Sequence, residues 1–425
     1  MRYVDMQRAQ LEKELKKLHA VYKEYKAQGL KLDMSRGKPG TAQVELSMGM
    51  FTCLDPREGY LAADGTDTRN YGMVDGLPET RALFADILHM EAENVIVGGN
   101  SSLNMMFDYI TQAYSSGLCG CEPWGKQGEV KFLCPSPGYD RHFAVTAYFG
   151  IKLIPVPMTA EGPDMNQVEN LVKDPTVKGI WCVPMYSNPD GITYSDATVR
   201  RLAAMKPAAK DFRIMWDNAY CLHHLGEDTD SLLDIFPELQ KNGNEDMVVM
   251  FTSTSKISFP GAGVAALAAS DANIADIKRR MTVQTIGYDK INMLRHVRYF
   301  KNIDGIREHM RHHAAIMRPK FETVLDALHR HLDGTGVAEW HEPKGGYFVS
   351  VNLMEGCAGR TISLLAHAGV HMTPAGATYP YGYDPQDSNL RIAPSYPPVE
   401  ELRVAMELFC VCAQIACIEK CLEEE

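Results

Sequence analysis

The turn Thr252-Ser253-Thr254-Ser255-Lys256-Ile257-Ser258-Phe259-Pro260-Gly261 places a lysine shortly after the apolar run from Met247 to Phe251. The apolar run predicts a buried strand, and the hydroxyl-rich segment predicts the turn that ends it. Upstream, the run from Phe212 to Trp216 leads directly into Asp217-Asn218-Ala219-Tyr220. Strand ends that carry polar groups in this way are typical of α/β proteins with a parallel sheet.

Lys256 and Asp217 form the pair of groups that pyridoxal phosphate requires. A lysine amine forms a Schiff base with the cofactor aldehyde, and a carboxylate keeps the pyridine nitrogen protonated so that the ring accepts electrons. A Ser-Lys dipeptide alone is common on protein surfaces and indicates little. Its position after a strand, with Asp217 at the end of another, predicts a Schiff-base enzyme that uses pyridoxal phosphate.

Short apolar runs alternate with helical or turn segments through the middle of the chain. The runs are 94–97, 130–134, 151–156, 179–183, 212–216, 247–251 and 264–269. This alternation predicts a mostly parallel sheet of seven strands with helices on both faces. Ligands of such sheets bind beyond the carboxyl ends of the strands, where Asn188, Asp217, Tyr220 and Lys256 are expected.

The remaining segments predict a smaller α+β domain. A long helix is expected from Asp289 to about His331, followed by strands around 347–351 and 390–393 and a terminal helix from Val399. An N-terminal helix over 6–27 is expected to join them. The predicted division is 1–45 for the N-terminal part of the small domain, 46–305 for the large domain and 306–425 for the rest of the small domain.

An ordered series of motifs extends over most of the chain. They are Ser35-Arg36-Gly37-Lys38-Pro39-Gly40, Asn70-Tyr71-Gly72, Gly98-Gly99-Asn100-Ser101-Ser102, Pro135-Ser136-Pro137-Gly138-Tyr139, Ser187-Asn188-Pro189-Asp190-Gly191, the Asp217 and Lys256 segments, Lys344-Gly345-Gly346-Tyr347 and Asn389-Leu390-Arg391-Ile392-Ala393. From about residue 31 to 400 this series resembles the class I/II aminotransferases, which are fold-type-I pyridoxal-phosphate enzymes. Thr-Ser-Lys-Ile followed by Pro-Gly-Ala-Gly is similar to a bacterial branch of aspartate aminotransferases.

The resemblance implies a set of cofactor ligands. Gly99, Asn100, Ser101 and Ser102 follow a strand and open a helix near Leu103, where free N–H groups and hydroxyls can bind the phosphate. A simple N-cap by Ser102 is the alternative interpretation. The family pattern adds four groups: Ser253 on the phosphate, Tyr139 stacked on the ring, and Asn188 with Tyr220 on its phenolic oxygen. Ser136-Pro137 and Asn188-Pro189 are candidate cis peptide bonds.

The resemblance also implies a substrate site and a homodimer. Arg391 matches the guanidinium that binds the substrate α-carboxylate, assisted by the backbone of Gly37, with a structural ion pair as the alternative interpretation. Tyr71 matches a residue that reaches the phosphate of the neighbouring subunit's cofactor. A dicarboxylic substrate needs a second cation, for which Arg36, and after it Arg69 and Arg141, are candidates.

One departure from the family pattern concerns the phosphate. Most relatives carry an arginine in the segment after the lysine, and here Gly263 stands where it would fall, within Pro260-Gly261-Ala262-Gly263-Val264. Other groups must then anchor the phosphate.

The implied reaction is transamination of an acidic amino acid, aspartate above all, with 2-oxoglutarate as acceptor. It would proceed as a ping-pong reaction through an aldimine and pyridoxamine phosphate, with Lys256, Asp217 and Tyr220 as catalytic residues. An aminotransferase for another amino acid, a pyridoxal-phosphate lyase and a non-catalytic effector-binding module remain alternatives.

Composition narrows the class of protein further. The net charge of −11 argues against a nucleic-acid partner, and the polar start and lack of long apolar runs predict a cytoplasmic protein without a membrane partner. The eleven cysteines indicate reduced thiols. Cys410, Cys417 and Cys421 suit one packed helix face, and His309, His312 and His313 suit a solvated face, so no metal site is expected.

Overall fold

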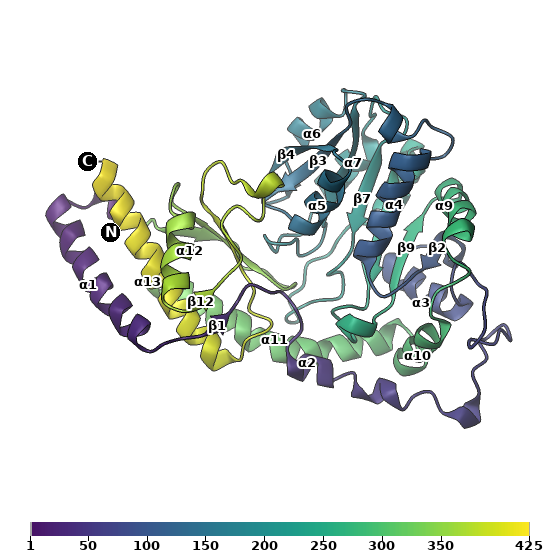
Figure 1. Ribbon diagram of the computed structural model, residues 1–425, viewed down its shortest axis with the longest axis horizontal. Helices are drawn as coiled ribbons and strands as arrows, with labels where there is room; N and C mark the ends of the chain where they lie inside the picture. The colour runs from purple at the N-terminus through teal and green to yellow at the C-terminus, as the bar shows by residue number, and fades with distance from the viewer. Residues whose placement is uncertain (1, 425) are drawn as a thin grey trace.

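The computed structural model describes residues 2–424 and has an α/β architecture built around one large sheet (Figure 1). The strand order is β2-β9-β8-β7-β6-β3-β4-β5. Strands β3, β4, β6, β7 and β8 pair in parallel, and β9 is antiparallel to both of its neighbours. Each predicted apolar run overlaps one of the strands β2 (Val95–Val97), β3 (Lys131–Ser136), β4 (Lys152–Thr159), β6 (Val177–Cys182), β7 (Arg213–Asp217), β8 (Val248–Ser253) and β9 (Ala265–Ala269). The predicted fold class is therefore confirmed.

The eighth strand, β5 (Gly162–Pro163), is not predicted from the sequence. It forms an antiparallel pair with the end of β4 at the edge of the sheet. Two residues are too few to show a strand periodicity, so this extension leaves no signal in the sequence.

Helices cover both faces of the sheet because side chains alternate along each strand. Ile214 and Trp216 of β7 belong to one buried apolar cluster, and Met215 between them belongs to another. The helices of this region are α3 (Pro78–Leu88), α4 (Ser102–Ser116), α5 (Asp140–Tyr148), α6 (Met165–Leu171), α7 (Asp196–Ala204), α8 (Ile235–Asn242), α9 (Asp271–Gln284) and α10 (Lys290–Phe300).

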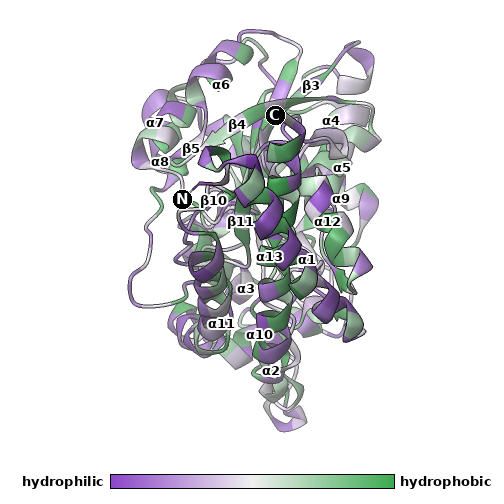
Figure 2. Ribbon diagram, turned by 90° about the vertical axis from the view of Figure 1, so that its left-hand side faces the viewer, coloured by the Kyte–Doolittle hydropathy of each residue, from purple (hydrophilic) through white to green (hydrophobic). Residues whose placement is uncertain are grey.

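A third apolar cluster joins the two ends of the chain. It includes Leu11 of α1 (Arg8–Ala27), Phe321 of α11 (Ile303–Leu332) and Phe409 of α13 (Val399–Glu424), and Figure 2 shows these three helices side by side. The same region holds α2 (Thr41–Glu45), α12 (Ala358–His367), the pair β1 (Leu32–Asp33) and β12 (Val370–His371), and the sheet of β10 (Ala338–Trp340), β11 (Val349–Leu353) and β13 (Asn389–Ile392). The domain boundaries at residues 45 and 305 stay a prediction.

The single helix expected from Asp289 to about His331 is wrong in one respect. The structure has two helices, α10 and α11, which are separated at Lys301 and Asn302. Lys301 has a positive φ of 67°, and the Asn302 side chain accepts a hydrogen bond from Gly305 N. Asparagine is a strong N-cap, so the chain ends one helix and starts the next here.

The solvated face expected for the α11 histidines is also wrong. His309 and His313 are 8% and 3% exposed, whereas the His312 side chain is 61% exposed. Helical spacing shows which residues share a face, but it does not show that another segment packs against that face. The expected packed face of α13 is confirmed, because Cys410, Cys417 and Cys421 are buried.

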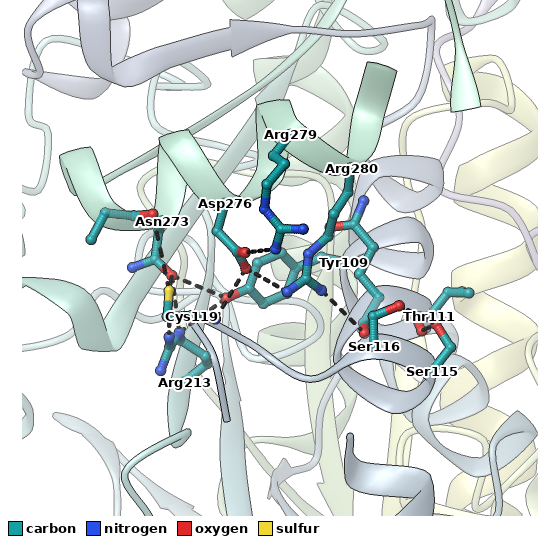
Figure 3. Close-up of polar contacts among 12 residues, drawn as sticks. Tyr109, Thr111, Ser115, Ser116, Cys119, Arg213, Asn273, Asp276, Arg279 and Arg280 are labelled. Atoms are coloured by element: carbon teal, nitrogen blue, oxygen red, sulfur yellow. Dashed lines mark hydrogen bonds and ion pairs between the residues drawn. The ribbon is translucent and has the colours of Figure 1, made fainter. Parts of the chain in front are cut away.

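A polar cluster fastens α4, α9 and β7 to one another (Figure 3). The buried Arg213 Nε donates to Tyr109 Oη at 3.0 Å, and its Nη2 lies 3.7 Å from Cys119 Sγ. Asp276 accepts from Cys119 N and pairs with Arg280 at 2.7 Å.

Between residues 2 and 424, no helix combines the length and apolarity needed to cross a membrane.

Candidate active site

Lys256 lies on the turn that follows β8, as predicted. Its Nζ lies 5.0 Å from the ring centroid of Tyr220 and 5.9 Å from that of Tyr347. It opens onto a cavity of about 190 Å³ at the carboxyl ends of the strands. The lining residues are Ser101, Ser102, Leu103, Met106, Tyr139, Val183, Asn188, Asp217, Ala219, Tyr220, Ser253, Ser255 and Lys256.

Asp217 ends β7 and faces the same cavity. Its Oδ2 lies 3.0 Å from Nε2 of His142, which is buried in the first turn of α5. Its Oδ1 is buried without a hydrogen-bond partner among the described residues. A buried carboxylate oxygen without a partner is costly, so this atom is suited to a donor that enters the cavity.

His142 is a site residue that the sequence analysis missed. Its ring stacks on Trp181 at 4.4 Å and meets the Tyr139 ring edge-on at 4.9 Å. It therefore fixes the Asp217 carboxylate and supports Tyr139 at once. A single histidine in a helix does not predict this role from the sequence. Its position in the helix that follows Tyr139 brings it into contact with Tyr139 and Asp217.

Tyr220 and Asn188 lie together at the cavity wall, as predicted. Both are buried, and their side chains are hydrogen-bonded to each other. Burial above all, and then the Asp217 carboxylate, raise the pKa of Tyr220, while Arg391 and the Asn188 hydrogen bond oppose this shift. The phenol therefore stays protonated and can donate to an acceptor in the cavity. The peptide bonds Ser136-Pro137 and Asn188-Pro189 are both cis.

Arg391 projects from β13 toward Asn188 and is 8% exposed. Its Nη1 donates to Asn188 Oδ1 at 3.2 Å and lies 3.4 Å from Asp140 Oδ1, and its Nε is buried without a partner among the described residues. The guanidinium carbon lies 4.9 Å from the Phe348 ring centroid. Gly37 packs against the Phe348 ring, because a Cβ at this position would lie 2.2 Å from a ring atom. The ion pair with Asp140 leaves Arg391 donor capacity for a substrate carboxylate.

Four hydroxyl groups line the end of the cavity near α4. Ser101 is the N-cap residue of α4 but makes no side-chain capping hydrogen bond, so the alternative interpretation of Ser102 as a simple cap is wrong. Ser253 Oγ donates to Ser255 Oγ at 3.0 Å, and Ser255 Oγ donates to Asn100 O at 3.3 Å. Ser255 was not predicted, although it lies on the same turn as Lys256. Hydroxyls at a helix N-terminus suit a phosphate.

Several predicted residues lie outside the cavity lining. Asn100 contributes backbone next to it, since Asn100 O accepts from the lining residue Ser255, whereas Gly99 O accepts from Ala265 N of β9. Arg36 is exposed, and Tyr71 is 82% exposed. The predicted groups that the structure gathers around Lys256 are Ser101, Ser102, Tyr139, Asn188, Asp217, Tyr220 and Ser253. The contact of Tyr71 with a neighbouring subunit stays a prediction.

The donors present fit pyridoxal phosphate. Hydroxyls and the α4 N-terminus match its phosphate, the Tyr220 phenol and Asn188 amide match its ring oxygen, and the unpartnered Asp217 Oδ1 matches its ring nitrogen. Among the described residues that line the cavity, Lys256 is the one cation. Within residues 2–424 there is no cluster of histidine, cysteine and carboxylate groups that could hold a metal ion.

Comparison with known proteins supports the same conclusion. The aspartate amino-transferase family model matches residues 6–425. An aspartate aminotransferase of Corynebacterium glutamicum is 45% identical over 94% of this chain and 92% of its own. The crystal structure of an aspartate transaminase from that organism has a TM-score of 0.97 and 43% identity, and covers 99% of both chains.

A more distant structure shows the fold alone. LysN, an α-aminoadipate aminotransferase from Thermus thermophilus complexed with N-(5'-phosphopyridoxyl)-L-leucine, has a TM-score of 0.72 at 19% identity and covers 94% of this chain and 95% of its own. Family, relatives and fold therefore agree, and the chain belongs to the aspartate aminotransferase family of fold-type-I, pyridoxal-phosphate-dependent aminotransferases.

Proposed function

We propose that the protein transfers the amino group of aspartate to 2-oxoglutarate with pyridoxal phosphate as its cofactor. The observation that carries this proposal is the buried, unpartnered Asp217 Oδ1 in the same cavity as the Lys256 amine. The choice of aspartate is supported by relatives that are named aspartate aminotransferases.

The chain's own residues divide the work of transamination. When bound, pyridoxal phosphate supplies an electron sink for the charge that develops at the substrate Cα. Lys256 Nζ takes the proton from the substrate Cα as general base, and the protonated amine then gives up that proton as general acid. Its amine lies over the rings of Tyr220 and Tyr347 and makes no hydrogen bond with another described residue, so no such bond must break when it reacts. Arg391 orients the substrate through its α-carboxylate.

The direct test is to incubate the cofactor-loaded protein with aspartate and 2-oxoglutarate and measure oxaloacetate and glutamate. A screen of the twenty amino acids for loss of the cofactor's resting absorbance band then ranks the donors. Formation of pyruvate or ammonia without a 2-oxo acid would instead indicate a lyase, and cofactor binding without turnover would indicate an effector-binding module.

We further propose that the active unit is a two-fold dimer. Met48, Phe51, Leu61 and Tyr71 are 53–82% exposed along the chain between α2 and α3, which runs outside α11 and α10 in Figure 1. Lys290 Nζ donates to Gly72 O at 3.0 Å, which ties this segment to α10. Exposed apolar side chains on a fixed segment are typical of a subunit interface.

Replacing Tyr71 by phenylalanine is expected to weaken cofactor binding, because the phosphate loses a donor from the other subunit. Mixing subunits tests the origin of that donor. A heterodimer of Tyr71→Phe and Lys256→Ala chains holds one site with both native residues, so random exchange restores about a quarter of native sites. Activity at limiting cofactor is the measurement. A fully active monomer, or no recovery on mixing, would contradict the arrangement.

The cation that binds the substrate side chain is expected among Arg36, Arg69 and Arg141. Replacing the responsible arginine by alanine should lower kcat/KM for aspartate about 10²-fold, about 3 kcal/mol, and leave alanine turnover little changed. Arg200→Ala, which removes an exposed ion pair with Asp196, is the control. If the ratio of aspartate to alanine turnover is unchanged in all three variants, the side-chain carboxylate is bound elsewhere.

A further inference from the structure

Four buried histidines surround the turn that carries Lys256. They are His223, His296, His309 and His313, which are 5%, 1%, 8% and 3% exposed. They come from three places in the chain: the turn after β7, α10 and α11. The transamination chemistry described above uses none of them.

The four histidines contact three successive residues of this turn, and two of them meet at one carbonyl oxygen. His223 Nε2 lies 3.3 Å from Lys256 O, and the Nε2 atoms of His309 and His313 lie 2.9 and 3.1 Å from Ile257 O. His296 Nε2 lies 2.9 Å from Ser258 Oγ. Between residues 2 and 424, the two α11 histidines are the groups within hydrogen-bond distance of the Ile257 carbonyl oxygen, and a carbonyl oxygen can only accept.

The protonation state of His313 follows from its partners. Gly40 N donates to Gln43 Oε1 at 3.0 Å, which fixes the orientation of the Gln43 amide. Gln43 Nε2 then donates to His313 Nδ1 at 3.2 Å and to Tyr347 Oη at 2.9 Å. His313 Nδ1 is therefore an acceptor, and its hydrogen is on Nε2, where it donates to the Ile257 carbonyl.

Electrostatics agree with neutral rings. Burial lowers the pKa of His313 to about 4 and that of His223 to about 3, and it lowers the pKa of His309 as well. A protonated His313 would also direct an Nδ1–H at the Gln43 amide hydrogens. Neutral donors satisfy the carbonyl without placing a second cation beside Lys256.

We propose that His309 and His313 are positioning residues for Lys256: as neutral donors that share the Ile257 carbonyl, they fix the turn from which the lysine enters the cavity. Gln43 sets the tautomer of His313 and links it to Tyr347, so the turn is held from the small-domain side of the molecule. The catalytic importance of this position rests on the proposed role of Lys256, but the hydrogen-bond arrangement does not.

Three variants separate positioning from packing. His309→Leu/His313→Leu removes both donors, His309→Gln/His313→Gln keeps an amide N–H near each Nε2 position, and His312→Leu changes an exposed neighbour on the same helix. In the cofactor-free proteins, hydrogen exchange of the peptide around residues 252–262 should be faster in the leucine pair and near native in the other two. In the loaded enzymes, kcat should fall about ten- to a hundredfold in the leucine pair with little change in KM, and the glutamine pair should recover most of it.

Equal losses in the leucine and glutamine pairs, or native exchange and kcat in the leucine pair, would overturn the proposal. If the native protein does not transaminate, the proposed function fails, whereas the exchange result still decides whether the histidines hold the turn. The ring ¹⁵N shifts of His313 in the native protein give a test without substitution: the hydrogen should be on Nε2 at neutral pH, and a charged ring or an Nδ1–H tautomer would contradict the arrangement.

Discussion

Replacing Lys256 by alanine is expected to leave a folded protein that has lost transamination by at least about 10⁴-fold, because the general base and acid is gone. Folding should survive, since within the described part of the chain Nζ contacts the Tyr220 and Tyr347 rings and makes no hydrogen bond. The variant should also fail to retain cofactor covalently when the protein is treated with borohydride and digested. Lys344→Ala, which removes an exposed ion pair with Asp228, is the matched control.

The borohydride experiment can contradict the central assignment directly. If the cofactor is trapped on another lysine of the Lys256→Ala protein, the turn after β8 is not the attachment site. A variant that does not fold, as judged by its circular dichroism and unfolding midpoint, would instead show that the Lys256 side chain has a structural role that its contacts do not indicate.

The second large effect is expected at Asp217. Alanine at this position should leave the hydroxyl groups of the phosphate end intact, so the protein should still bind the cofactor. Turnover should fall by several orders of magnitude, because no carboxylate then keeps the ring nitrogen protonated. The measurement is a comparison of cofactor affinity, followed by absorbance, with kcat for aspartate.

A cofactor analogue provides the control for Asp217→Ala. An analogue methylated at the ring nitrogen carries the positive charge permanently, so it should restore part of the lost turnover in the variant. Near-normal turnover with the ordinary cofactor would remove Asp217 from the mechanism. If the analogue supports turnover in the native protein but not in Asp217→Ala, the carboxylate acts by positioning the cofactor ring, a role that it would share with His142.

The sequence predicts the sheet well because its strands are buried on both faces. The run from Met247 to Phe251 is apolar throughout, and the run from Phe212 to Trp216 is interrupted only by Arg213. The polar groups that follow these strands lie at the same edge of the sheet. Lys256, Asp217 and Asn188 come together for that reason. Their positions just after predicted strands are enough to predict a shared site, because parallel strands bring their carboxyl ends together.

The residues that the sequence does not predict act through packing. His142 supports Asp217 from a different element, and the burial of His309 and His313 depends on the turn after β8 lying against α11. The break at Lys301 depends on a positive φ at a residue that is neither glycine nor asparagine. Periodicity along one segment does not describe contacts between segments, so these features become visible only in three dimensions.

The long helix α11 lacks one main-chain hydrogen bond in its interior, at Pro319. Its Ile306 and Met310 pack in the core beneath the large sheet, and Met317 and Phe321 pack in the core shared with α13. Pro319 lies inside the helix and has no N–H to donate to the Ala315 carbonyl. Bending is easiest where a main-chain hydrogen bond is missing. The missing hydrogen bond therefore lies in the part of α11 that packs with α13, beyond His309 and His313, so a bend at Pro319 would leave their contacts with the lysine turn in place.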